Sequence, residues 1–190
     1  MNKVYLLIIA GCIAIPSVSV ASDYGLGVSI KSSDVSVYIP VRVNESLFVE
    51  PYFRYSIFDS SEFGVSTGRE DSSTTYDFGV GLFKVLNSIN GLSPYYGTRI
   101  GYLSSENDNQ NRFTTGDWEY KSTLRGFIIS PALGVKYSFH ENISIGFEAE
   151  WFYRDLDGDT VTNSNGTVTI SDRSQTSSGT NTKIIIRYFY

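Results

Sequence analysis

The chain has few of the residues on which disulfide-stabilised domains, metal centres and nucleic-acid interfaces depend. Its 190 residues include one Cys and one His, and only 18% are charged. One Cys excludes a disulfide scaffold, and one Cys with one His cannot assemble a zinc site. A net charge of −5 argues against nucleic acid as a partner. Aromatic residues are abundant instead, with 14 Tyr and 12 Phe, which excludes disorder and indicates a β-rich domain.

The first residues have the layout of a secretory signal peptide. A positive start at Lys3 precedes an almost wholly apolar run over 4–15, and small residues lead up to Ala21. This run is too short for a stable membrane anchor. We therefore assign 1–21 to a cleaved signal peptide and 22–190 to one exported domain. The alternative is a lipoprotein with lipidated Cys12, against which the apolar residues that follow Cys12 argue.

Beyond residue 21, apolar and polar residues alternate with a period of two. In 143–154, for example, Phe147 and Trp151 fall on one face, and Glu148 and Glu150 on the other. The period predicts eight strands of the length used by transmembrane barrels, over 24–31, 35–43, 47–58, 75–86, 94–104, 127–139, 143–154 and 182–190. Short connections alternate with three long polar segments, 59–73, 105–119 and 155–180. The predicted fold is all-β, an eight-stranded antiparallel transmembrane up-and-down β-barrel.

Alternation alone leaves open which face lies inside the barrel. A soluble lipocalin-like carrier would turn its apolar face towards a ligand cavity. The Gly, Ser and opposite charges of the polar face, together with the unequal loops, favour the reverse arrangement. Charges inside a narrow barrel must pair, so we predict an ion-pair network that plugs the lumen, with a gated narrow pore as the alternative. Its candidate members are Arg42, Glu50, Arg54, Asp77, Arg99, Lys136, Glu148, Glu150, Arg154 and Arg187.

Together these features resemble the small outer-membrane β-barrel family of the OmpA, OmpX and opacity-protein type. The resemblance rests on the signal, the eight strands, the segments 95–102 and 130–137, and the aromatic last strand, and it covers 23–190. It implies a place among the lipids of the outer membrane of a Gram-negative bacterium. It also implies insertion by the outer-membrane assembly machinery, which would read Tyr188, Phe189 and Tyr190. The family more often ends in Phe than in Tyr.

The long segments carry most of the acidic charge, with twelve acids against three bases. We expect 59–73, 105–119 and 155–180 to be solvated extracellular loops, through which an unknown ligand could bind. The predicted role is structural or surface-interacting, and an adhesin is the nearest alternative. Asp155, Asp157 and Asp159 could wrap a hard cation, but their spacing fits a turn better than a calcium loop. No metal or cofactor is therefore expected.

Catalysis is not expected either. The alternative would be a lipid-modifying outer-membrane enzyme, which needs a His oriented towards a nucleophile. The only His, His140, falls in the short turn 140–142, at the end of the barrel predicted to face the periplasm. The sequence therefore predicts a barrel that is not an enzyme.

Overall fold

The computed structural model describes residues 24–31, 34–63, 67–113 and 116–190, and strands account for most of them. The predicted signal peptide, with Cys12, lies outside these residues. The strands are β1 (Gly25–Lys31), β2 (Asp34–Tyr38), β3 (Val41–Asn44), β4 (Leu47–Phe63), β5 (Thr67–Val85), β6 (Leu92–Phe113), β7 (Gly116–His140), β8 (Ile143–Ser164) and β9 (Thr167–Phe189). The described residues contain no helix long and apolar enough to cross a bilayer.

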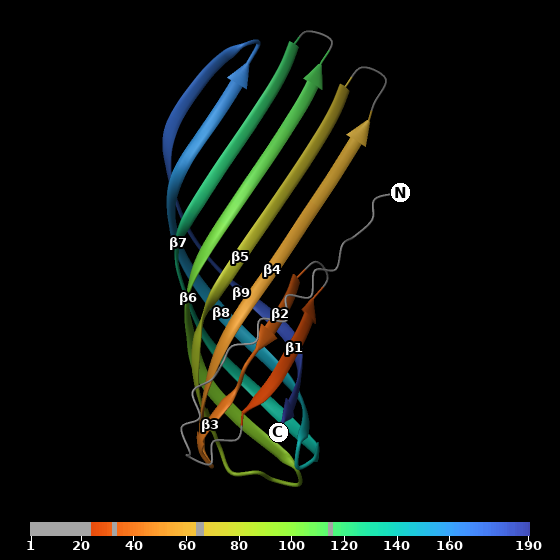
Figure 1. Ribbon diagram of the computed structural model, residues 1–190, viewed down its shortest axis with the longest axis vertical. Helices are drawn as coiled ribbons and strands as arrows, with labels where there is room; N and C mark the ends of the chain where they lie inside the picture. Colours follow the sequence, from red (N-terminus) through yellow and green to blue (C-terminus); the bar gives the residue numbers. More distant parts are fainter. Residues whose placement is uncertain (1–23, 32–33, 64–66, 114–115) are drawn as a thin grey trace.

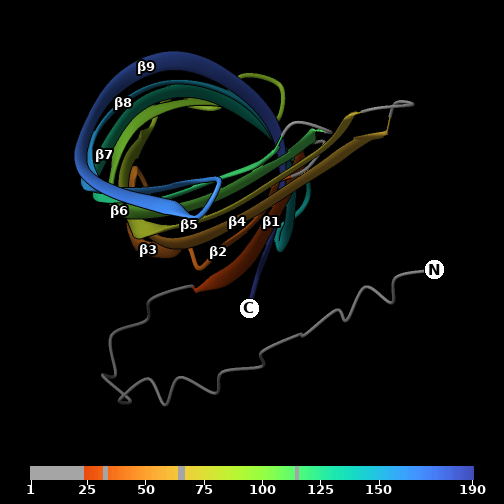
Figure 2. The same cartoon turned by 90° about the horizontal axis from the view of Figure 1, so that it is seen from above.

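The strands close into a ring in which every pairing is antiparallel. From β4 to β9, each strand pairs with the next along the chain. β1 pairs with β9 from Gly25–Phe189 to Ser29–Ile185, and so closes the ring (Figures 1 and 2). β2 and β3 both pair with β4 and occupy one position in the ring, because Pro40 lies between them and has no N–H for the ladder. The eight-stranded antiparallel barrel predicted from the sequence is confirmed.

Within the residues that the structure describes, the three segments predicted as long loops form paired strands, so the prediction of loops was wrong. β4 and β5 remain paired up to Phe63–Gly68, and β6 and β7 up to Phe113–Gly116. β8 and β9 remain paired up to Ser164–Thr167. The turn between them is Asn165-Gly166, with φ angles of 50° and 84°, the positive values that a two-residue hairpin turn requires. Backbone ladders thus continue where the apolar period of the sequence ends.

These hairpins continue the barrel wall beyond its mouth, and we call this part the extension. It comprises 57–63, 67–75, 105–113, 116–124 and 155–176 of β4–β9. Figure 1 shows the strands rising well past the ends of β1 and β2. The last described pairs with the short strands are Asp34–Ser56 and Ser29–Ile185. Beyond them, within the described residues, the wall is an open, curled sheet rather than a closed ring.

The interior is packed by large side chains lying over glycines. An aromatic cluster of Phe48, Phe83 and Tyr95 fills the end with the short turns. A second cluster, at the foot of the extension, contains Leu103, Leu124, Ile128 and Leu156. Gly134 is required because a Cβ there would overlap the ring of Tyr95. The barrel is therefore narrow enough for side chains from opposite walls to meet.

Candidate functional site

The outer face of the barrel is an apolar band bordered by aromatic rings. Phe127 is 71% exposed and Leu133 is 69% exposed, although both are large and apolar. Near the extension, the Tyr55 and Tyr76 rings lie 5.2 Å apart. At the other end, the Tyr24 and Tyr190 rings lie 5.3 Å apart. An outward apolar band between aromatic girdles is typical of lipid-facing barrels. It is the reverse of a lipocalin-like carrier, so that alternative was wrong.

A buried guanidinium lies at the centre of the lumen. The Arg99 side chain is 1% exposed and comes from β6. Its Nη2 lies 2.7 Å from Glu50 Oε1, and its Nη1 lies 2.5 Å from Glu148 Oε1 and 3.4 Å from Glu150 Oε2. Glu50 belongs to β4, and both other carboxylates belong to β8. Arg99 therefore connects three well-separated positions of the wall.

Further bases complete this arrangement. Arg187 Nε lies 2.8 Å from Glu50 Oε2, and Lys183 Nζ lies 3.1 Å from Glu148 Oε1 and 2.8 Å from Glu150 Oε2. Arg54 reaches Glu150 at 3.1 Å and Asp77 at 3.6 Å. We call this group the lumen network: Glu50, Arg54, Asp77, Arg99, Glu148, Glu150, Lys183 and Arg187. Its four carboxylates face four bases, so its formal charges balance.

Aromatic side chains hold the lumen network in place. The Tyr52 hydroxyl donates to Asp77 at 2.9 Å, and the Tyr95 hydroxyl donates to Glu148 at 3.1 Å. The Arg99 guanidinium lies 4.5 Å from the centroid of the Phe83 ring and 5.2 Å from that of Tyr38. Such contacts restrict both the carboxylates and the bases to one geometry.

Seven of the ten lumen residues proposed from the sequence lie in the network, and three lie elsewhere. The Arg42 guanidinium lies 5.0 Å from the centroid of the inward-facing Phe189 ring. Lys136 lines a hollow near the short turns together with Arg42. Arg154 Nε donates to Ser177 Oγ at 2.5 Å, at the foot of the extension. Lys183 was missed, although it alternates with the outward-facing Ile184 and the period of β9 could have identified it.

Little space remains around the lumen network. One hollow, lined in part by Arg42, Phe48, Lys136 and Arg187, has a volume of about 20 Å³. Another, beside Arg54, Glu150 and Lys183, has a volume of about 10 Å³. A cavity needs about 10–15 Å³ to hold one water molecule. At this level the barrel is filled by side chains.

The two faces of the extension differ in chemistry. The strand register places most of its carboxylates on the outer face: Asp59, Glu70, Glu106, Asp108, Glu119, Asp155, Asp157, Asp159 and Asp172. On that face Lys121 Nζ lies 2.8 Å from Glu119 and 3.6 Å from Asp108, and these carboxylates raise the pKa of Lys121. The inner face carries mainly hydroxyls and carboxamides, with Trp118 and Tyr120 among them. A ligand would therefore meet very different surfaces on the two sides.

The remaining candidate chemical groups lie apart from one another. His140 ends β7 in an exposed turn, where its Nδ1 accepts from the Asn142 N–H at 3.4 Å. Asp155, Asp157 and Asp159 lie in the extended strand β8, so they form no turn around Gly158. In the part of the chain that the structure describes, no three His, Cys, Asp or Glu residues are placed to hold a metal ion.

Comparison with known proteins finds similarity in structure but no match in sequence. No known family and no curated protein matches the sequence. A major outer membrane protein of Thermus thermophilus matches with a TM-score of 0.60 and 10% identity, over 90% of this chain and 100% of that chain. Acinetobacter baumannii CarO2 matches with a TM-score of 0.55 and 9% identity, over 88% and 98% of the two chains. The outer membrane protease OmpT of Escherichia coli matches with 0.59 and 14%, over 83% of this chain and 63% of OmpT. At these identities a match shows a shared fold, and this chain has the fold of the small outer-membrane β-barrels.

Proposed function

We propose that the protein is an integral outer-membrane barrel with a plugged lumen, which holds the extension outside the cell for a structural or surface-interaction role. The observation that carries the proposal is the separation of side chains by face. On the same strands, large apolar residues face outward and a balanced set of charges faces inward. Lipid solvates the outward set and cannot solvate the inward set, so this pattern suits a barrel that crosses a membrane.

The unequal ends of the barrel give the proposed orientation. Outer-membrane barrels have short periplasmic turns and long extracellular connections. The turns that follow β3 and β7 are short, whereas the hairpins at the other end extend far beyond the barrel. The acidic outer face of the extension would then lie outside the cell. An extracellular ligand and the assembly machinery that would recognise residues 188–190 remain part of the proposal.

The filled lumen favours a plug over a pore and over an enzyme. An eight-stranded barrel is just wide enough for its own side chains, and here the central charges are already paired. The matched fold includes a protease, but the carboxylates of this lumen are held by bases. We therefore propose no catalytic role. An adhesin remains the second candidate, since the extension offers a large surface.

Replacing Glu148 and Glu150 with Ala tests the plug. The double variant would leave Arg99 and Lys183 with fewer carboxylates, and breaking a buried pair costs about 3–5 kcal/mol. We expect a lower melting temperature in detergent and a new conductance in planar bilayers. The matched control is Asp157→Ala with Asp159→Ala, on the outer face of the same strand, which should change neither property. Steady conductance through the parent protein would contradict the plug.

Cysteine labelling in intact cells tests the orientation. The only native Cys, Cys12, falls in the predicted signal peptide. A single introduced Cys would therefore show on which side of the outer membrane its residue lies. Ser174→Cys in the extension should react with a membrane-impermeant maleimide, and Ser46→Cys beside a short turn should not. Labelling of Ser46→Cys alone would place the extension on the periplasmic side and reverse the proposal.

A further inference from the structure

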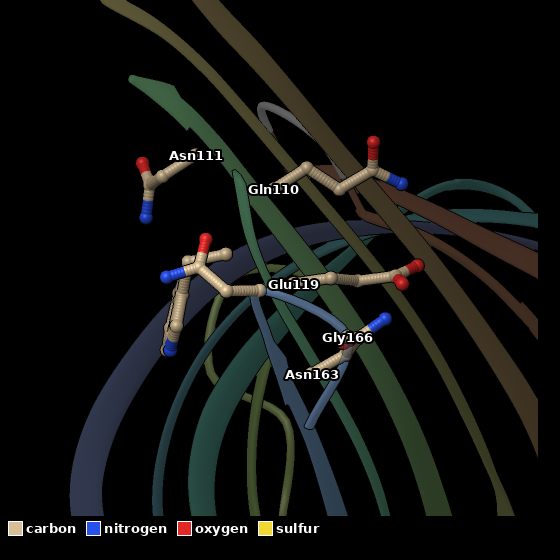
Figure 3. Close-up of a pocket in the computed structure, with 7 residues that line it drawn as sticks. Gln110, Asn111, Glu119, Asn163 and Gly166 are labelled. Carbon is tan, nitrogen blue, oxygen red and sulfur yellow. The ribbon is translucent and has the colours of Figure 1, made fainter. Parts of the chain in front are cut away.

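A hollow of about 480 Å³ opens at the far end of the extension. It lies where β8 ends at Ser164, opposite Trp118, while β7 continues to Gly116. This step in the end of the sheet lets side chains from both faces reach the same space. In Figure 3, Gln110, Glu119 and Asn163 project to one side of the ribbon and Asn111 projects to the other. A ligand at the step would therefore contact both faces of the sheet.

The lining of this hollow is rich in neutral hydrogen-bonding groups. Gln110, Asn111, Asn163 and Asn165 contribute four carboxamides, and Trp118 contributes an indole. Each carboxamide offers two N–H donors and an oxygen with two lone pairs. Small-molecule pockets are usually lined mainly by apolar side chains, and this one is not. The lining suits a ligand that presents many hydroxyl groups.

The charge of the hollow restricts the ligand further. Glu119 is its one acidic side chain, and Lys121 Nζ binds that carboxylate at 2.8 Å. No Lys or Arg is among the described residues that line it, and the neighbouring Lys121 ammonium is already paired with Glu119. A metal site is not indicated either, because a single carboxylate among carboxamides is a weak ligand set for a cation. A neutral ligand fits best.

The Trp118 indole and the Asn163 carboxamide have contacts that set them apart from the rest of the lining. The rings of Trp118 and Tyr120 stack with centroids 5.7 Å apart and planes 14° apart, and Arg173 donates a hydrogen bond to the Tyr120 hydroxyl. The stack fixes the orientation of the indole. In addition, Asn163 Oδ1 has no hydrogen-bond partner among the described residues. The Asn163 oxygen is buried, so the contacts open to a ligand are the oriented aromatic face and the other carboxamide groups of the lining, one kind for the C–H face of a sugar ring and one for its hydroxyl rim.

We propose that this hollow binds a neutral glycan. The Trp118 indole packs against the C–H face of one sugar ring, and the carboxamides of Gln110, Asn111 and Asn163 bind hydroxyl groups. Acidic glycans are disfavoured by the many carboxylates on the outer face of the extension. This inference rests on the proposed function, because the hollow must face the outside of the cell to meet such a ligand.

An oligosaccharide array with neutral, sialylated and sulfated members tests the proposal. Folded protein in detergent should bind neutral members, and mild periodate oxidation of those glycans should abolish binding. Trp118→Ala should reduce binding at least ten-fold, and Asn111→Ala combined with Asn163→Ala should do the same. The matched control is Ile170→Ala, an exposed residue of the extension outside the hollow, which should bind as the parent does. The mobility of unboiled samples on gels checks that each variant is folded.

Intrinsic fluorescence gives a second readout of binding, measured in solution. The chain has two Trp residues, so Trp151→Phe leaves Trp118 as the only one. A neutral oligosaccharide selected on the array should shift its emission. The proposal is overturned if no neutral glycan binds, if only charged glycans or peptides bind, or if Trp118→Ala binds like the parent. If Ser174→Cys is labelled from outside the cell but no glycan on the array binds, the proposed function is supported and only the glycan site is overturned.

Discussion

At the scale of single residues, the lumen is organised by size as well as by charge. Tyr95 reaches across to Glu148 because Gly134 has no side chain in its way. Gly101 likewise leaves space for the Tyr52 hydroxyl, which donates to Asp77. Two carboxylates of the lumen network thus receive their neutral donors through gaps left by glycines. Substitutions at these glycines would change the network without touching any charge.

Gly134→Ala should therefore destabilise the barrel, and Gly146→Ala should be tolerated. Both glycines face inward on neighbouring strands, but a Cβ on Gly134 would overlap the Tyr95 ring, whereas one on Gly146 would meet its nearest atom at 3.4 Å. Overpacking of this kind costs about 1–3 kcal/mol. Thermal unfolding in detergent measures the difference. Equal melting temperatures for the two variants would mean that Tyr95 does not occupy this gap.

The sequence could indicate which residues face inward but not which of them meet. A period of two assigns a face to every residue of a strand. Partners across a barrel also depend on the stagger of the strands and on where each strand ends. Arg154 faces inward on β8 at the foot of the extension, where the short strands β1 and β2 no longer pair with the wall, and it binds Ser177 instead. Contacts across the lumen thus depend on strand ends, which composition does not reveal.

At the scale of elements, the length of the strands was the feature that the apolar period of the sequence did not predict. The apolar period stops where the proposed contact with lipid would stop, whereas backbone pairing continues in strands made of Ser, Thr, Asn and charged residues. One local signal was available, since Asn-Gly between β-branched residues is a strong hairpin pattern. Asn165-Gly166, with Thr162 before it and Val168 after it, is such a pattern and lies in the middle of the segment predicted as a loop.

The end of β9 is the element on which closure depends. Leu26 pairs with Tyr188 and Gly25 with Phe189, and the N–H of Tyr190 donates to the Tyr24 carbonyl at 2.9 Å. Deleting residues 188–190 removes these pairs and also the aromatic end that the assembly machinery is expected to read. We expect the truncated protein not to accumulate in outer-membrane fractions, as followed by immunoblotting.

Tyr190→Phe is the matched control for this deletion, because it keeps the aromatic ring and the backbone pairing. It should accumulate like the parent. Normal levels of the truncated protein would show that neither the closing pairs nor the aromatic end is required for assembly.

At the scale of the whole molecule, the proposed function places a large share of the chain beyond the membrane. A strand that crosses the hydrocarbon core needs about 9–11 residues, at about 3.3 Å per residue. β7 has 25 residues and β9 has 23. The remainder is a hydrogen-bonded sheet instead of a set of independent loops, so the glycan site proposed above would be held at a defined height above the barrel.

A closed ladder around a filled lumen should resist detergent without heat. Unfolding requires breaking continuous pairing on both sides of a strand, and the resulting barrier makes the folded state kinetically persistent. We expect unboiled and boiled samples to migrate differently on a denaturing gel. Identical migration of the two samples would argue against a closed barrel.

The seam between β1 and β9 differs from every other described pairing in the chain distance that it spans. The other pairs join strands that are near neighbours in sequence, whereas Gly25 meets Phe189 across nearly the whole described chain. Bringing distant segments together costs more conformational entropy of the chain and slows folding. The seam should therefore form after the strands of the hairpins have paired. It is also short, with five residue pairs against twenty-two between β6 and β7. Within the closed ring, away from the solvent-exposed extension, amide hydrogen exchange should therefore be faster along β1 and the last residues of β9 than along β6 and β7, so the seam that completes the barrel is also where it would first open.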